Sequence, residues 1–426
     1  MGYENLASLR FLGYINHMEP MVRKVTYRLY PSRTQLVALF ETMRMHQQLY
    51  NACLEQRIDA YRKAGITLSY ADQCKQLTDL RRECPEFATV NCSSQQVTLR
   101  RLDKAFKAFF ERVKKGKGSA GFPRFKSLNG YLGFGFKSHG DGWRFTPGAD
   151  WKHGKLRLQG IGVIKSRGQA RQGGFIKSCE LLHRNGTWHL SLTLECPEII
   201  RQGGTEACAY DWGVETFLTL AVADGDAAPA METVGNPRWF QSEREKIADL
   251  QRSVSRKKRE SNRRKKSVRK LAKARAATAR RRMDWHHKLS AGMVGRFALI
   301  ASESLTIKNM TASAKGTVDE PGRMVAQKTG LNREILDTAP SQFESILGYK
   351  AMEAGSMRMK APTRKLKPSQ TCPACGSVKK KTLSDRTHKC EDCGHTAPRD
   401  FASAWVVLNW ALHSLKHLGL EQAEAA

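Results

Sequence analysis

Two Cys-x-x-Cys pairs near the C-terminus constrain the fold more than any other feature of this sequence. Cys372-Pro-Ala-Cys375-Gly is followed, after fourteen intervening residues, by Cys390-Glu-Asp-Cys393-Gly. Each pair can present two thiolates to one side of a tetrahedral ion, so the spacing predicts a zinc ribbon rather than four unrelated thiols. Because four sulfur ligands leave no position for water, we expect one structural Zn²⁺. We expect the nearby His388 and His395 to be exposed or to support the ligands, and not to bind the metal themselves.

Three carboxylates stand where predicted elements of secondary structure end or begin. Asp211 closes a short apolar run before a Trp-Gly break, and Glu303 closes a second apolar run. Asp400 precedes the apolar residues 401–412, which predict a helix. A single aspartate at a strand end is most often a turn residue, but acids at two strand ends and one helix start are the pattern of a two-metal nuclease site. Such carboxylates hold the divalent cations that clamp the attacking and leaving oxygens of a phosphodiester.

The charge of the chain is strongly one-sided. Its 72 Lys and Arg residues against 40 Asp and Glu residues give a net charge of +32. Such a charge favours a polyanionic partner and opposes self-association. A basic protein of the membrane surface is the rival interpretation, but the sequence has no long apolar stretch and no N-terminal signal pattern.

Length and cysteine usage set the broad class. A chain of 426 residues is long enough for two to four domains. The seven cysteines outside the two pairs are scattered along the chain, which favours reduced thiols and a cytoplasmic protein over a disulfide framework.

Residues 252–282 hold sixteen Lys and Arg residues and one acid, Glu260. A charged run is usually a solvated face, but cations four residues apart repel one another along a helix, and a phosphate backbone would relieve that repulsion. We therefore expect nucleic-acid contact here, on a helical hairpin that turns near Ser261-Asn262. The candidate contacts are Arg256, Lys257, Lys258, Arg263, Arg264, Lys265, Lys266, Arg269 and Lys270.

The N-terminal half predicts a strand, a helical region and then a β module. Residues 22–30 alternate like a strand, Ser32 is a candidate N-cap, and helical periodicity continues to about residue 113. Short alternating runs over 131–196, with a hairpin signal at Asn185-Gly186, predict a β-barrel-like module.

Two further segments, residues 122–126 and 311–330, have compositions that suggest a function or a structure. Phe122, Arg124 and Lys126 mix aromatic rings with cations, which suits stacking on bases and phosphate binding, although an ordinary edge strand would have the same composition. Residues 311–330 predict a mobile loop beside the three acids, followed by a helix over 343–352 and a strand over 356–359.

Taken together, these motifs resemble TnpB, the transposon-encoded RNA-guided nuclease, and its descendants, the miniature type V CRISPR effectors. The resemblance runs from about residue 22 to residue 412. Besides the zinc pairs, it is carried by Arg28-Leu-Tyr-Pro31 with Gln35, Gly121-Phe-Pro-Arg-Phe-Lys126, Asp211-Trp-Gly-Val-Glu-Thr-Phe217, Arg282-Met-Asp-Trp-His-His-Lys-Leu-Ser290, Glu303-Ser-Leu-Thr-Ile-Lys-Asn-Met310 and Arg399-Asp400.

The resemblance implies an α/β multidomain fold. Its parts would be an RNase H-like RuvC core with a zinc-ribbon insertion that binds target nucleic acid, and an N-terminal lobe made of a wedge β-barrel with an inserted helical recognition domain. The boundaries we expect are a tail at 1–20; the first wedge strand at 21–35; the recognition domain at 36–115; the rest of the wedge barrel at 116–205; the nuclease core at 206–361, with basic helices at 240–290; the zinc insertion at 362–397; and the C-terminal helix and tail of the core at 398–426.

The resemblance further implies an RNA-guided DNA endonuclease. Asp211, Glu303 and Asp400 would hold two catalytic Mg²⁺, the guide RNA would pair with target double-stranded DNA, and the N-terminal lobe would read a short adjacent motif. We expect a prokaryotic cytoplasmic protein, associated with the nucleoid when it is bound to DNA. A large structured RNA or a second copy of the chain, as a homodimer, would be needed to cover a full heteroduplex.

The sequence departs from the family pattern around the third acid. Where relatives have Asp-Arg-Asp followed by x-Asn-Ala-Ala, this chain has Pro398-Arg399-Asp400 followed by Phe-Ala-Ser403-Ala, and Trp212 stands where a small aliphatic residue is commoner. Two alternatives stay open. An RNA-guided DNA-binding protein that represses without cutting would be expected to have lost the acids, and a generic zinc-ribbon nucleic-acid-binding protein would leave the three acids unexplained.

Overall fold

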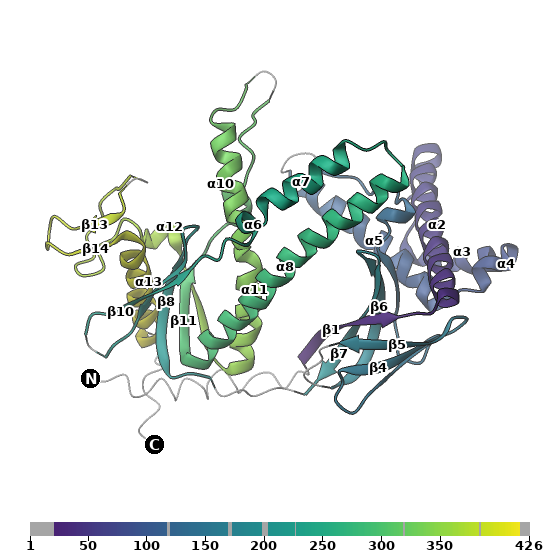
Figure 1. The fold of residues 1–426 in the computed structure, drawn as a ribbon, viewed down its shortest axis with the longest axis horizontal. Helices are drawn as coiled ribbons and strands as arrows, with labels where there is room; N and C mark the ends of the chain where they lie inside the picture. The colour runs from purple at the N-terminus through teal and green to yellow at the C-terminus, as the bar shows by residue number, and fades with distance from the viewer. Residues whose placement is uncertain are drawn as a thin grey trace. The chain divides into compact units, whose positions relative to one another are not determined.

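The computed structural model describes residues 21–116, 120–168, 173–197, 203–225, 227–317, 320–382 and 385–417. The chain divides into two compact units, an N-terminal unit within Glu19–Glu198 and a C-terminal unit within Ile199–Ala426. Figure 1 shows the elements of both units. The expected tail at 1–20 lies outside the described residues.

A seven-stranded antiparallel sheet forms the core of the N-terminal unit, in the order β2-β6-β7-β1-β5-β4-β3. Its strands are β1 (Met21–Tyr30), β2 (Gly133–Phe136), β3 (Trp143–Pro147), β4 (His153–Leu158), β5 (Gly162–Gly168), β6 (Phe175–Arg184) and β7 (Thr187–Cys196). Alternate residues of β7 are buried, including Trp188, Leu190, Leu192 and Leu194, as the period of two requires. The predicted β module is therefore present as an antiparallel sheet, and no ladder joins the edge strands β2 and β3 within the described residues.

The predicted hairpin at Asn185-Gly186 is confirmed. Arg184 pairs with Thr187 across the turn, and the two turn residues have φ values of +50° and +77°. A two-residue turn with both φ angles positive matches the twist of its strands, and asparagine followed by glycine adopts it at the least cost.

Helices α2 (Arg33–Ala64), α3 (Tyr70–Glu83), α4 (Pro85–Ala88) and α5 (Cys92–Lys114) lie between β1 and β2 in the sequence. The Ser32 hydroxyl accepts a hydrogen bond from the Gln35 backbone N–H, and the Gln35 side chain accepts one from the backbone of Ser32, so α2 begins at the predicted cap. Gly65, at φ +65°, ends this helix. The short helix η1 (Leu128–Gly130) leads back to the sheet.

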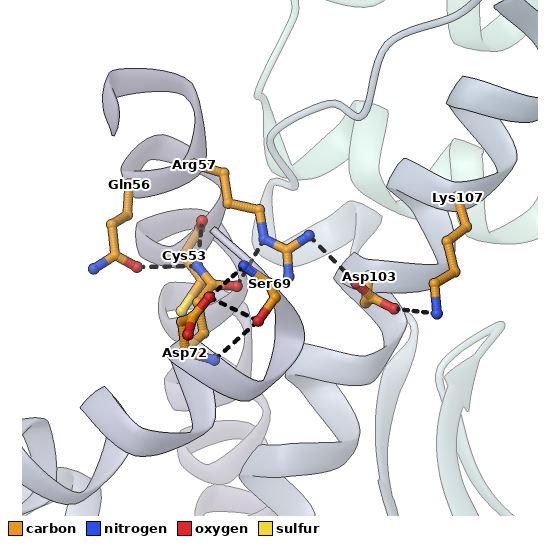
Figure 2. A network of polar contacts seen from close by, with 8 residues as sticks. Cys53, Gln56, Arg57, Ser69, Asp72, Asp103 and Lys107 are labelled. Atoms are coloured by element: carbon orange, nitrogen blue, oxygen red, sulfur yellow. Dashed lines mark hydrogen bonds and ion pairs between the residues drawn. The ribbon is translucent and has the colours of Figure 1, made fainter. Parts of the chain in front are cut away.

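A buried arginine joins three of these helices (Figure 2). The Arg57 Nε donates to Gln73 on α3 at 2.9 Å, and its Nη1 lies 3.5 Å from Asp103 on α5. Asp103 is also paired with Lys107 at 3.0 Å, while Gln73 donates to the carbonyl of Cys53 at 2.9 Å. Because the guanidinium is almost fully buried, the partners of its Nε and Nη1 replace part of the water that it loses on folding, and its Nη2 has no partner among the described residues.

A mixed five-stranded sheet, in the order β10-β9-β8-β11-β12, forms the core of the C-terminal unit. Its strands are β8 (Glu206–Trp212), β9 (Thr216–Val222), β10 (Ala230–Gly235), β11 (Phe297–Glu303) and β12 (Met357–Ala361). β10, β9 and β8 are antiparallel, whereas β8, β11 and β12 run parallel. The strand predicted near 356–359 is confirmed as β12.

Helices cover both faces of this sheet (Figure 1). One face packs against α13 (Arg399–His417) through small residues such as Ala209, Ala301 and Ala404, which allow the helix to approach closely. The other face packs against α8 (Asn262–Arg296) and α11 (Pro340–Ala354), with Phe343 and Leu347 in that second core.

The predicted basic helical hairpin is confirmed. It consists of α7 (Arg244–Ser255) and α8, which pack against each other, and the Ser261 hydroxyl caps α8 by accepting a hydrogen bond from the Arg264 N–H at 3.1 Å. The short helices α6 (Trp239–Ser242) and α9 (Ile307–Met310) lie nearby in the sequence, before α7 and after β11.

The loop predicted over 311–330 is partly wrong. α10 (Val325–Thr338) begins inside it, after Met324 in a left-handed conformation, and α11 then includes the helix predicted over 343–352. The remaining elements are α12 (Thr363–Leu366) and the hairpin of β13 (Thr387–Lys389) with β14 (Thr396–Pro398). No helix in the described ranges combines the length and the apolar character needed to cross a membrane.

Candidate functional site

Asp211 and Glu303 lie at the same edge of the C-terminal sheet. The last residue pair in register between the parallel strands β8 and β11 is Tyr210 with Ser302, and the two acids directly follow it. Side chains alternate along a strand, so Asp211 shares a face with Ala209, and Glu303 shares a face with Ala301. Both alanines pack in the core formed with α13. The carboxylates therefore belong to the sheet face that α13 covers.

Asp400 comes to this edge because it occupies the first turn of α13. One turn later on the same helix, the Ser403 hydroxyl donates a hydrogen bond to Glu303 Oε1 at 3.1 Å. The structure thus brings together the three acids that the sequence singled out, from β8, β11 and α13. It adds Ser403, which sequence reasoning noted only as a departure from the family pattern.

Glu303 and Asp400 act electrostatically on Asp211. Burial raises the pKa of Asp211 well above its usual value, and the charges of Glu303 and Asp400 raise it further. Burial also raises the pKa of Glu303, while the Ser403 hydroxyl and the Arg399 guanidinium act in the opposite direction. Negative charge is therefore unfavourable here without a cation, which is the condition that makes a carboxylate cluster bind divalent metal.

Their donor chemistry fits Mg²⁺, because carboxylate oxygens are the ligands that hard divalent cations prefer. Within the described ranges, the three carboxylates are not gathered as tightly as metal ligands are; the cysteine cluster is the group of three or more potential ligands that is.

The four predicted zinc ligands converge. The Sγ atoms of Cys372 and Cys393 are 3.7 Å apart, those of Cys375 and Cys390 are 3.6 Å apart, and all four lie within 4.8 Å of one another. Four sulfurs around a tetrahedral zinc at about 2.3 Å would be roughly 3.8 Å apart, so the cluster fits this ion.

Backbone geometry supports the same conclusion. Each pair ends in a tight turn at glycine, with φ +77° at Gly376 and +72° at Gly394. Backbone N–H groups of Cys393 and Asp392 lower the pKa of the Cys390 thiol to about 6, whereas neighbouring thiols raise the pKa of Cys375 and Cys393. One thiolate therefore forms readily, and the close sulfurs disfavour further negative charge until a cation binds.

Neither nearby histidine is part of the ligand cluster. His388 is buried and not exposed, and its Nδ1 is in hydrogen-bond contact with Lys381. His395 is half-buried and packs edge-on against Trp405 of α13, at 5.2 Å between ring centroids.

A polar network beside Asp211 and Glu303 was not predicted from the sequence. Tyr210, directly before Asp211, donates its hydroxyl to Glu344 on α11. Arg358 and Lys360 of β12 pair with the same carboxylate at 2.9 and 2.8 Å. Burial would raise the pKa of Glu344, but these partners outweigh it and hold the pKa below its usual value. No local sequence pattern predicts this network, because its members are up to 150 residues apart in the sequence.

The predicted phosphate contacts of the basic hairpin are accessible. Arg256, Lys257 and Lys258 lie in the turn between α7 and α8, and the remaining candidates lie in the first turns of α8. Arg263, Lys265, Lys266, Arg269 and Lys270 are exposed, and Arg264 is half-buried. Of the described acids, none forms an ion pair with these six α8 cations, so their charges are not neutralised internally.

The alternative interpretation of residues 122–126 as an edge strand is wrong. They form an irregular segment in which the backbone N–H and carbonyl of Lys126 bond to the side-chain amide of Asn51, both at 2.9 Å. Phe122 is half-exposed and packs edge-on against Phe106 and Phe109 of α5. Arg124 and Lys126 are exposed.

Three families match parts of the chain. Residues 195–314 match the OrfB_IS605 family, described as "Probable transposase". Residues 341–407, which include the zinc cluster, match "Cas12f1-like, TNB domain". Residues 18–65 match a family described as "Helix-turn-helix domain", although their described part forms β1 and the single long helix α2.

Whole-chain comparisons agree with these matches. The chain is 32% identical over 319 residues to "Putative RNA-guided DNA endonuclease InsQ" of Escherichia coli (strain K12), covering 74% of this chain and 73% of the relative. It is 28% identical over 398 residues to "Putative RNA-guided DNA endonuclease" of Streptomyces pristinaespiralis, covering 92% and 90%.

Two solved structures share its α/β fold. The protein in "Cryo-EM structure of the Cas12f1-sgRNA-target DNA complex" is similar with a TM-score of 0.51 at 11% identity, over 92% of this chain and 99% of that one. "Structure of the mini-RNA-guided endonuclease CRISPR-Cas_phi3" is similar with a TM-score of 0.53 at 7% identity, over 94% of each chain. At such identities the likeness is one of fold.

Proposed function

The chain belongs to the TnpB-like family of RNA-guided DNA endonucleases, which is related to the miniature type V effectors, and from this premise we propose how its residues carry out the reaction. The protein is an RNA-guided DNA endonuclease. Asp211, Glu303 and Asp400 are its catalytic residues, and together they bind two Mg²⁺. These carboxylates would hold the cations, whose chemistry there would be to activate a water at neutral pH and to stabilise charge on the leaving oxygen.

One observation carries this assignment. Asp211 and Glu303 lie at the ends of the adjacent parallel strands β8 and β11, and Ser403 of α13 donates to Glu303, so the first turn of α13 with Asp400 lies at the same sheet edge. A fold gains nothing in stability from placing three carboxylates where they repel, so their proximity has a functional explanation.

We propose finer assignments of the fold on the same basis. The mixed sheet β10-β9-β8-β11-β12 with α13 would be the RNase H-like RuvC core, and the antiparallel sheet with α2 to α5 would be the wedge barrel and recognition domain. The domain boundaries remain those expected from the sequence.

The other parts then acquire roles. One structural Zn²⁺, held by the four cysteines, would order the insertion that contacts target nucleic acid. The basic hairpin α7–α8 and the cations of residues 122–126 would hold the backbones of guide RNA and target double-stranded DNA. The protein would work in the prokaryotic cytoplasm, on nucleoid DNA, and a homodimer is one way to cover the full heteroduplex.

The alternative of RNA-guided binding without cleavage is not favoured. It predicts loss of at least one of Asp211, Glu303 and Asp400, and all three are present.

The function is tested with protein co-expressed with its native flanking locus. The RNA that copurifies is sequenced, and a matching DNA library with randomised flanks is incubated with the complex in Mg²⁺ and in EDTA. We expect cuts in Mg²⁺ alone, beside a recurring short motif. Bound RNA and bound target without any cut would replace this account with the binding-only function.

A further inference from the structure

A small cavity opens beside Glu303, on the sheet face opposite α13. It has a volume of about 220 Å³, and its lining includes Glu303, Trp212 and Lys360 at the ends of three adjacent strands. Pockets for drug-sized ligands are larger, roughly 300–1,000 Å³, so this one suits a single planar group.

Its lining combines aromatic side chains with two acids, Glu303 and Glu344, and one cation, Lys360. Phe343 and Tyr210 are almost fully buried, and Trp212 is the partly exposed aromatic side chain among the lining residues. The indole Nε1 of Trp212 is buried and has no hydrogen-bond partner among the described residues.

The charges at the rim suit a nucleic-acid strand. The Glu344 carboxylate, which would otherwise repel phosphate, is paired with both Lys360 and Arg358. The Lys360 side chain is 51% exposed, so the rim presents a cation to solvent. Glu344 with its two cations therefore carries one positive charge in excess next to the aromatic side chains. Glu303 is the other acid of the lining, and its charge would be offset by the cations that it is proposed to hold.

We propose that this cavity receives the base of a nucleotide next to the scissile phosphate, stacked on Trp212, while Lys360 contacts the adjoining backbone. The inference rests on the proposed function, because Glu303 both lines the cavity and belongs to the catalytic set. Glu303 and Trp212 line the same cavity, so a strand held at Glu303 would pass beside Trp212. Stacking accepts any base, so this contact positions the strand and leaves sequence reading to the guide.

The test combines substitutions of Trp212 with abasic nucleotides in the DNA substrate. Targets with a mapped cut site receive a single abasic nucleotide at each position flanking the cut, and single-turnover rates are measured for the wild-type complex, Trp212→Leu and Trp212→Phe. We expect one abasic position to slow the wild type roughly ten-fold. On intact DNA, Trp212→Leu should cut about ten-fold more slowly than the wild type. The abasic nucleotide at that position should not slow Trp212→Leu any further. Trp212→Phe should keep most of the wild-type rate on intact DNA.

A second variant approaches the cavity from α11. Ser341 is exposed and lines the cavity, so Ser341→Phe should fill it and reproduce the coupling of Trp212→Leu to the abasic position. Equal losses on intact and abasic targets in both variants would mean that the cavity only supports the fold, and would overturn the proposal.

A fluorescence measurement that does not require cleavage distinguishes the proposed base-binding cavity from the proposed catalytic assignment. 2-Aminopurine placed at the sensitive position should be quenched when the target binds in EDTA, and Trp212→Leu should relieve the quenching. Quenching without any Mg²⁺-dependent cut would refute the catalytic assignment and support the pocket. Cutting without quenching at any flanking position would refute the pocket alone.

Discussion

At the scale of single residues, Ser403 supports one of the three acids at the point where this chain departs from the family pattern. The family asparagine is replaced by Ala402, and the next residue, Ser403, supplies a hydroxyl that donates to Glu303. A hydrogen bond that orients a metal-binding carboxylate commonly contributes 10- to 100-fold to metal affinity or activity. We expect Ser403→Ala to need more Mg²⁺ for half-maximal cleavage and to cut about ten-fold more slowly at low Mg²⁺.

Ser403→Thr is the matched control, because it keeps the hydroxyl. A Mg²⁺ titration of Ser403→Ala that overlays the wild-type curve would show that the hydroxyl does not support Glu303.

His46 makes stability depend on pH. Its ring is buried between Thr98, Ser94 and Phe134, and burial, reinforced by Arg101, lowers its pKa to about 3. The unfolded chain, with an ordinary pKa near 6.5, therefore binds the proton first as the pH falls. This contribution to stability is complete above about pH 6.5 and declines between pH 6.5 and 3, by up to about 1.4 kcal/mol per pH unit.

We expect His46→Gln to be less stable than the wild type at pH 7 and to lose less stability on acidification. The free energy of unfolding of both proteins is measured by urea denaturation between pH 7 and 4.5. Groups other than His46 titrate in both proteins, so their contributions cancel when the two free energies are subtracted. A difference in unfolding free energy that does not vary with pH would show that the pKa of His46 is the same in the folded and unfolded states.

At the scale of elements, the zinc ribbon makes the sharpest stability prediction. Cys390→Ser removes one of four converging ligands, so we expect less than one zinc per chain and local unfolding of the β13–β14 hairpin. Metal analysis and limited proteolysis measure both effects. Cys92→Ser, at an exposed thiol outside the cluster, is the control. A full zinc complement in Cys390→Ser would reject the ligand set.

Elements specified by local chemistry were predictable from the sequence. The Ser32 cap, the Asn185-Gly186 turn and the Ser261 hairpin each depend on residues within a few positions of one another, and each is present. The convergence of Asp211 and Glu303 was also foreseeable, because parallel strands end at the same edge and strand periodicity fixes the face.

Features that depend on distant partners were not predictable. Residues 122–126 have the composition of a strand but bond to side chains of α2, and His388 is buried through contact with Lys381. The network of Tyr210, Glu344 and Arg358 has no sequence signature at all. Such contacts arise from tertiary packing, which overrides local propensity.

At the scale of the whole molecule, the net charge of +32 predicts strongly salt-dependent nucleic-acid binding. Changing Arg263, Arg264, Lys265 and Lys266 together to Gln should reduce the slope of log affinity against log salt, by up to about 0.9 for each lost contact with duplex DNA. Filter binding over a range of salt concentrations measures this slope.

The matched control removes the same charge from cations that already pair with acids on helix surfaces. It changes Arg44, Lys63, Arg82 and Lys288 to Gln. The control should change the slope less than the α8 variant does. Equal slopes in the wild type and the α8 variant would make the basic hairpin a solvated face.

The most direct test of the account is the cleavage rate of Asp211→Asn in its copurified RNA complex. The substitution keeps shape and removes the charge on which metal binding depends, and Glu215→Gln, at an exposed acid four residues on, is the control. We predict that Asp211→Asn retains its RNA and binds target but cuts more than about 100-fold more slowly, beyond the loss typical of a residue that only supports a ligand. Wild-type cutting by Asp211→Asn would contradict the assignment of this carboxylate, and with it the proposed catalytic site.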